Sequence, residues 1–257
     1  MIRYFMHIFT MWGFEMEYSE YIIFIIEIIG TIAFAISGAM VGIKKHMDLF
    51  GVNVLGITTA VGGGLIRDLI LSIAPPAMFR NKVYALTAIA TATVTFYAVY
   101  LKEKKSSRKS KEKNQMEHLA VQHLKSLMEE SSVQTSKFQE RYDRLLFFGD
   151  TVGLGVFTVM GSYTAIEAGY GDTRFLAVFV GVLTGVGGGM IRDVLAGNTP
   201  FILVKHIYAV ASLAGALAFV LLFPYLPELQ CMLVGALIVV VIRILAAHYR
   251  WNLPRIP

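Results

Sequence analysis

Seven stretches of the sequence are mostly apolar over about the 20 residues that a helix needs to cross a bilayer. They cover residues 18–42, 49–73, 83–101, 145–168, 175–195, 201–223 and 229–247. Proline or glycine occurs in several of the short connections between them, where helices are expected to end. The sequence lacks the alternation of apolar and polar residues that is typical of β-barrel strands. It therefore predicts an all-α integral membrane protein with seven transmembrane helices.

The charged residues are concentrated in one segment. Of the 41 Asp, Glu, Lys and Arg residues, 18 lie within residues 102–144. The remaining 23 are too few to solvate the surface of a globular protein, which excludes a soluble single-domain enzyme. The predicted organisation is an N-terminal tail over 1–17, a first helical unit over 18–101, a charged cytoplasmic insertion over 102–144, a second helical unit over 145–223, and a last helix with a cytoplasmic tail over 224–257.

The distribution of lysine and arginine predicts the orientation, because these residues favour the cytoplasmic side of a membrane protein. With seven helices, Lys44, Lys45, residues 102–144 and the C-terminal tail share one side, and the acidic residues Glu17 and Glu20 lie on the other. The first side is the more basic. We therefore expect a multi-pass protein of the bacterial inner (cell) membrane, with its N-terminus outside and its C-terminus in the cytoplasm.

The chain contains an internal duplication. The sequence GGGLIRD at residues 62–68 recurs as GGGMIRD at 187–193. A P-x7-Y-A pattern follows each copy, and an acid-x-x-G-x-x-x-F-x-x-x-G pattern precedes each copy. Each unit holds three helices, so the second unit enters the membrane from the opposite face. The sequence predicts two inverted three-helix repeats plus one C-terminal helix, an arrangement that places a site near the bilayer midplane.

A glycine triplet lies inside one predicted helix of each repeat. The triplets consist of Gly62, Gly63, Gly64, Gly187, Gly188 and Gly189. Each glycine costs about 1 kcal/mol in helix propensity relative to alanine. We expect a kink or an unwound turn in both helices, which is tolerated at membrane depth where the backbone is buried or lines a wet cavity. The alternative is that the glycines allow two helices to pack closely.

Six charged residues are predicted to face the interior of the bundle: Glu27, Arg67, Asp68, Asp150, Arg192 and Asp193. An ionised side chain facing lipid costs about 2.5–3.5 kcal/mol at the centre of a helix. Their depths predict a Glu27–Arg67 cluster in the outer third and an Asp150–Arg192 cluster in the inner third. Four carboxylates against two arginines give a negative interior that attracts cations. The alternative is that the pairs serve only to hold the bundle together.

The residue patterns of enzymes and cofactor sites are missing from the sequence. The six histidines have no metal-ligand spacing, and Cys231 has no partner cysteine. We find no nucleophile motif, no nucleotide-binding loop and no nucleic-acid motif. We therefore expect no enzyme activity, metal, cofactor or nucleic-acid partner.

The charged insertion has two parts. The part from Lys102 to Lys113 is a basic run beside the third predicted helix, suited to anionic lipid at about 1 kcal/mol per nearby basic residue. Residues 115–130 have the apolar spacing of an amphipathic helix. A lipid-sensing element is one interpretation, and a solvated linker between the repeats is the other.

The duplicated patterns together resemble a bacterial membrane family built from two copies of the glycine-transporter domain, which is similar to prokaryotic trimeric intracellular cation (TRIC) channels. The resemblance covers residues 18–247 and departs at 102–144, where relatives usually have a short connection. It implies a homotrimer of seven-helix subunits. It also implies a pore in each subunit, lined by helices that kink at the glycine motifs, here residues 62–64 and 187–189.

Two functions are compatible with these features. The first is a passive monovalent-cation (K⁺/Na⁺) channel, favoured by the excess of interior carboxylate and by the resemblance. The second is a transporter of a small zwitterionic amino acid such as glycine, with Arg binding the carboxylate and Asp the ammonium group. A non-transporting scaffold is a third class. The first two differ in whether Arg67 and Arg192 are already neutralised by carboxylates of the protein.

Overall fold

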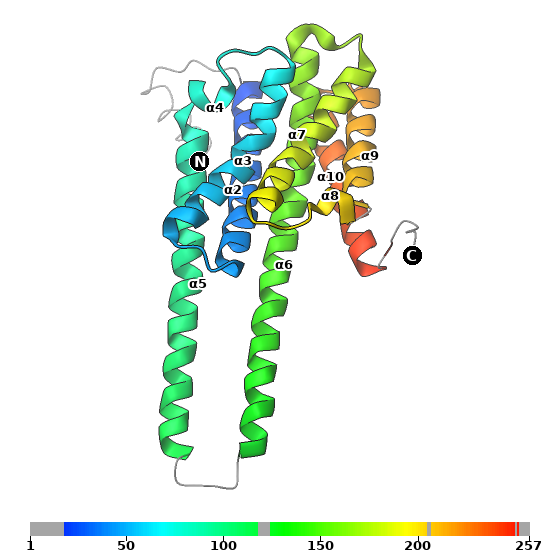
Figure 1. Cartoon of the computed structure of the whole chain (residues 1–257). Helices are drawn as coiled ribbons and strands as arrows, with labels where there is room; N and C mark the ends of the chain where they lie inside the picture. Colours follow the sequence, from blue (N-terminus) through cyan, green and yellow to red (C-terminus); the bar gives the residue numbers. More distant parts are fainter. Residues whose placement is uncertain (1–17, 118–123, 205–206, 250, 252–257) are drawn as a thin grey trace.

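The structure is a computed structural model that describes residues 18–117, 124–204, 207–249 and 251 (Figure 1). It is built of helices, without strands among these residues. In chain order they are α2 (Tyr18–Lys44), α3 (Leu49–Ile70), α4 (Ala77–Arg80), α5 (Lys82–Glu117), α6 (Leu124–Ala165), η1 (Ile166–Tyr170), α7 (Arg174–Leu195), α8 (Phe201–Val204), α9 (Ile207–Leu222) and α10 (Glu228–His248). The prediction of an all-α membrane protein is confirmed.

Six of these helices are long and apolar enough to cross a membrane, namely α2, α3, α5, α6, α7 and α10. The seventh apolar helix, α9, is shorter. In its predicted stretch, 201–223, the structure has the short helix α8 and then α9. The predicted N-terminal tail over 1–17 lies outside the described residues.

The two helices that flank the charged insertion are longer than predicted. Helix α5 continues past residue 101 to Glu117, and α6 begins at Leu124 instead of residue 145. Because residues 102–144 contain neither glycine nor proline, nothing in the sequence ends the helix at the membrane boundary. The two extensions project beyond the rest of the bundle on the same side (Figure 1). The predicted amphipathic helix over 115–130 includes residues 118–123, which lie outside the described part of the chain.

The centre of the bundle is formed by α2, α3, α6 and α7. Helix α3 packs against α7, and α2 packs against α3 and α6. The rings of Phe34 and Phe157, which hold equivalent positions in the duplicated pattern, stack at a centroid distance of 5.2 Å. Both rings are buried. The duplicated segments therefore meet at the middle of the molecule.

Both glycine triplets remain α-helical, so the expectation of an unwound turn is wrong. A Cβ atom on Gly63 would collide with the backbone carbonyl oxygen of Thr184, and one on Gly188 with that of Thr59. The middle glycines thus let α3 and α7 cross with their backbones in contact. This close packing offsets the low helix propensity of glycine and is the alternative that the sequence left open.

Candidate functional site

The ends of α3 and α7 have the same local structure. Each helix is followed by a residue in the left-handed region, Ser72 with φ 56° and Gly197 with φ 65°. The next backbone N–H groups, of Ile73 and Asn198, each donate a hydrogen bond of 2.8 Å back to the carbonyl oxygen of the aspartate in the motif. This reversal directs the chain back over the end of the helix, so that the following short helix begins beside that aspartate.

The Arg-Asp pair of each motif forms the same pair of contacts. In both copies the arginine Nε lies 2.8 Å from Oδ1 of the next residue, Asp68 or Asp193. The second carboxylate oxygen accepts a backbone hydrogen bond, from Ala77 at 2.7 Å in the first copy and from Phe201 at 2.9 Å in the second. Ala77 and Phe201 are the first residues of α4 and α8. Each aspartate therefore joins the arginine of its helix to the start of the next helix.

Around the first Arg-Asp pair lies the first cluster, which we define as Glu27, Arg67, Asp68 and Tyr84. The hydroxyl of Tyr84 donates a hydrogen bond to the carboxylate of Glu27. Arg67 and Asp68 are buried, with 5% and 1% of their surface exposed, whereas Glu27 and Tyr84 are only half-buried. Glu27 and Tyr84 are thus the two residues of this cluster that are more accessible to water.

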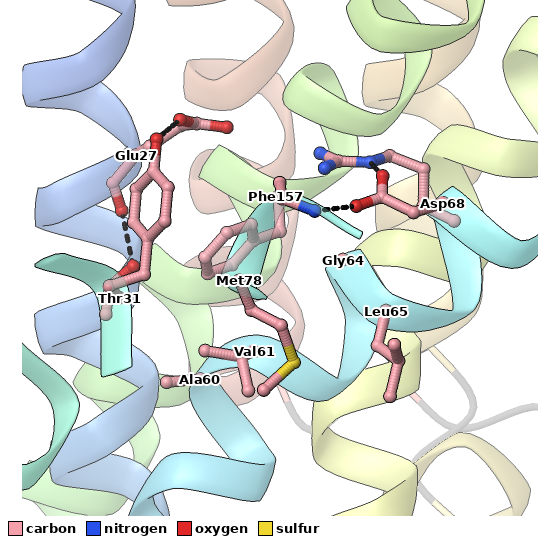
Figure 2. Close-up of a pocket in the computed structure, with 12 residues that line it drawn as sticks. Glu27, Thr31, Ala60, Val61, Gly64, Leu65, Asp68, Met78 and Phe157 are labelled. Atoms are coloured by element: carbon pink, nitrogen blue, oxygen red, sulfur yellow. Dashed lines mark hydrogen bonds and ion pairs between the residues drawn. The ribbon is translucent and has the colours of Figure 1, made fainter. Parts of the chain in front are cut away.

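The first cluster borders a small pocket with a cavity volume of about 30 Å³, enough for water to enter (Figure 2). The pocket is lined by Glu27, Thr31, Ala60, Val61, Gly64, Leu65, Arg67, Asp68, Ala77, Met78, Tyr84 and Phe157. Figure 2 shows Glu27 and Asp68 on opposite sides of it. A Cβ atom on Gly64 would meet only the Arg67 guanidinium, at 3.8 Å or more. The third glycine of the triplet therefore faces the pocket instead of the neighbouring helix.

Around the second Arg-Asp pair lies the second cluster, which we define as Asp150, Arg192, Asp193, Tyr208 and Arg243. Asp150 Oδ1 lies 2.6 Å from Arg192 Nη1 and 3.3 Å from the Tyr208 hydroxyl, and its Oδ2 lies 3.3 Å from Arg243 Nη2. All five residues are buried, and none is more than 5% exposed. Two arginines and two aspartates leave this cluster without net charge.

The structure brings together the predicted site residues only in part. Asp150 pairs with Arg192, as expected. Glu27 and Arg67 border the same pocket, but among the described residues Glu27 is bonded by Tyr84, and Arg67 by Asp68. The six glycines divide into three pairs. Gly62 and Gly187 face the side chains of Ile191 and Ile66 on the opposite helix, Gly63 and Gly188 contact the opposite backbone, and Gly64 and Gly189 face the two clusters.

The sequence interpretation missed three residues of the two clusters. Arg243 is an isolated charge in the apolar helix α10, a pattern that marks an inward-facing residue. Tyr84 and Tyr208 belong to the P-x7-Y-A pattern, which marks the duplication but does not by itself indicate a contact with the upstream acid. With Arg243 included, the interior holds three arginines against four carboxylates. The negative excess therefore belongs to the first cluster alone.

Within the described ranges, no group of three or more His, Cys, Asp or Glu residues is placed to hold a metal ion. The first cluster offers two carboxylates on opposite sides of a water-accessible pocket (Figure 2). Such an arrangement can attract a monovalent cation but does not enclose it.

Comparison with known families gives a match that covers both copies of the duplication. The model of the family described as glycine transporter matches residues 24–100 and again residues 147–224. A UPF0126 membrane protein of Deinococcus radiodurans is 36% identical over 231 residues, 89% of each chain. The UPF0126 inner membrane protein YadS of Escherichia coli is 33% identical over 91% of this chain and 95% of its own.

Solved structures of TRIC channels share the fold. A TRIC cation channel is 33% identical, with a TM-score of 0.68 over 91% of this chain and 96% of its own. The TRIC trimeric intracellular cation channel orthologue from Rhodobacter sphaeroides is 29% identical, with a TM-score of 0.69 over 90% and 99%. A prokaryotic TRIC channel in 0.5 M KCl is 29% identical, with a TM-score of 0.71 over 91% and 100%. The likeness thus extends over nearly the whole length of these chains.

Proposed function

The chain belongs to the glycine-transporter family of membrane proteins, and from this membership and its likeness to TRIC cation channels we propose that it is a passive channel for the monovalent cations K⁺ and Na⁺. The observation that carries the proposal is the similarity in both sequence and fold to a cation channel over nine-tenths of the chain. The distribution of charge in the first cluster supports it.

The proposed assembly is a homotrimer in which each subunit has its own pore, since one of the similar channels is trimeric. Each subunit is proposed to consist of two inverted three-helix repeats plus α10, with the Phe34–Phe157 stack near the axis that relates the repeats. The reciprocal contacts of Gly63 and Gly188 support this arrangement. The bias of basic residues supports an outer N-terminus and a cytoplasmic C-terminus.

The pocket beside Glu27 is proposed as one mouth of the pore. Asp68 already neutralises Arg67, so the carboxylate of Glu27, when ionised, is left to attract a cation. A carboxylate in a pocket with low-dielectric walls concentrates counter-ions. The absence of a side chain on Gly64 keeps the path beside Arg67 clear.

The alternative function, a carrier of glycine, requires an arginine that is available to a substrate carboxylate. In both motifs the arginine Nε is bonded to an adjacent aspartate, and Arg192 also pairs with Asp150. These contacts neutralise both arginines, which favours the channel.

The start of the charged extension is proposed to contact anionic lipid. Lys102, Lys104 and Lys105 are exposed on α5, directly after its apolar part. Basic side chains in this position are attracted to anionic headgroups within about one Debye length of the membrane.

Substituting Glu27 tests the proposed pore mouth. Glu27→Gln keeps an acceptor for the Tyr84 hydroxyl but removes the charge, and we expect K⁺ flux from proteoliposomes to fall by about tenfold. Glu167→Gln makes the same chemical change at an exposed residue of η1 and should leave the flux unchanged. Equal flux from wild type and Glu27→Gln would remove Glu27 from the pathway.

A further inference from the structure

We propose that Arg243 acts as a tethered cation. Its guanidinium occupies, in the second cluster, the position that is open to a diffusible cation in the first cluster. The inference rests on the proposed channel function and concerns how the two halves of the pathway differ. It assigns a role in controlling cation access to a residue outside the duplication.

The two clusters have the same core of residues. Asp150, Arg192, Asp193 and Tyr208 hold the positions in the second copy of the repeated patterns that Glu27, Arg67, Asp68 and Tyr84 hold in the first. In both copies the arginine bonds the next aspartate and the tyrosine hydroxyl bonds the upstream acid. Each core has two carboxylates and one arginine. Without further residues, the two clusters would have the same excess of one negative charge.

Arg243 makes the net charges of the two clusters unequal. It lies on α10, outside the duplication, and its Nη2 reaches Asp150 Oδ2 at 3.3 Å. Its guanidinium carbon also lies 4.7 Å from the ring centre of Tyr208 and 5.1 Å from that of Phe147. Within the described part of the chain, Glu27 receives no comparable second cation. The second cluster is therefore neutral, and the first is not.

Larger side chains also fill the space beside the second cluster. Two small residues that line the pocket of the first copy, Thr31 and Ala77, correspond to Leu154 and Phe201 in the second. Leu154 is fully buried, and the Phe201 ring centre lies 4.9 Å from the Arg192 guanidinium. The equivalent of the open pocket is thus narrowed by side chains as well as neutralised by Arg243.

Burial shows how strongly Arg243 is tied to Asp150. Arg243 is 5% exposed and Asp150 is 0% exposed, in a helix bundle whose surroundings are apolar. A buried ionised side chain is stable only when it is paired. Cation entry to Asp150 therefore requires Arg243 to move away, and Arg243 controls whether the inner half of the pathway attracts cations.

Neutralising Arg243 tests this role in channel recordings from planar bilayers. We expect Arg243→Met to raise K⁺ conductance or open probability by about tenfold, because the second cluster then has the same net charge as the first. Arg243→Lys keeps the charge and should remain within about twofold of wild type, and Asp150→Asn combined with Arg243→Met should cancel the gain. A folded Arg243→Met trimer with unchanged or reduced K⁺ current would overturn the inference.

A second measurement uses the wild-type protein and therefore does not depend on whether a variant folds. Wild-type crystals soaked in Rb⁺ should show anomalous density beside Glu27 and none beside Asp150. Rb⁺ at Asp150 with Arg243 still in contact would contradict the tethered-cation role. A wild-type protein without K⁺ current, or without Rb⁺ at Glu27, would instead count against the proposed channel itself. If the wild-type protein conducts K⁺ and the Arg243→Met variant carries the same current, only the proposed role of Arg243 is rejected.

Discussion

Arg192→Met is expected to reduce the free energy of unfolding by about 3–5 kcal/mol, the typical cost of removing one partner from a buried ion pair. Arg192 is fully buried and contacts three side chains at once: Asp150 at 2.6 Å, Asp193 at 2.8 Å and Ser37 at 2.5 Å. Methionine fills most of the volume but leaves two buried aspartates with Arg243 as their single cation. SDS-induced unfolding in detergent micelles, followed by circular dichroism, measures the loss.

Arg67→Met is the matched control, because it makes the same change at the equivalent position of the first copy. Arg67 forms one charged hydrogen bond, with Asp68, among the described residues and borders a pocket that water can enter. We expect it to lose about 1.5–3 kcal/mol, the typical value of one such bond. A loss equal to or greater than that of Arg192→Met would show that the two clusters do not differ in the way their burial indicates.

Gly63→Ala is expected to destabilise the protein by about 1–3 kcal/mol, as overpacking does in a close-packed interior. The added methyl group would overlap the backbone carbonyl oxygen of Thr184 on α7, which cannot turn aside as a flexible side chain can. Helices α3 and α7 must then separate along their crossing. The same unfolding measurement detects this effect.

Gly64→Ala separates this packing role from a general intolerance of the motif to side chains. Its Cβ atom has free space, with the nearest atom of Arg67 at 3.8 Å. Alanine has a helix propensity about 1 kcal/mol better than glycine, so Gly64→Ala should leave stability unchanged or slightly raised. If Gly63→Ala proves as stable as Gly64→Ala, then Gly63 is not required for the close backbone contact between α3 and α7.

Much of the fold could be predicted from the sequence because the membrane imposes a simple pattern. The apolar stretches match the long helices, and the pairing of Asp150 with Arg192 followed from their depths in the predicted repeats. Both inferences depend on the cost of placing polar groups in lipid, which is large and local. The predicted ends of α5 and α6 are wrong, because the cost of exposing polar groups to lipid no longer applies outside the membrane.

The role of the glycines and the difference between the clusters could not be predicted in this way. A glycine triplet is compatible with an unwound turn and with a close helix crossing, and only the position of the Thr184 carbonyl distinguishes them for Gly63. The duplication itself suggested two equal clusters. The difference in net charge between the clusters comes from Arg243 on α10, which lies outside the duplication. Its contact with Asp150 depends on tertiary packing.

Conduction of monovalent cations is tested most directly by the reversal potential of the purified wild-type protein in a planar bilayer under a KCl gradient. We expect discrete current steps that reverse close to the K⁺ equilibrium potential and far from that of Cl⁻. Reversal near the Cl⁻ potential, or a silent bilayer with folded protein that exchanges labelled glycine in counterflow, would contradict it.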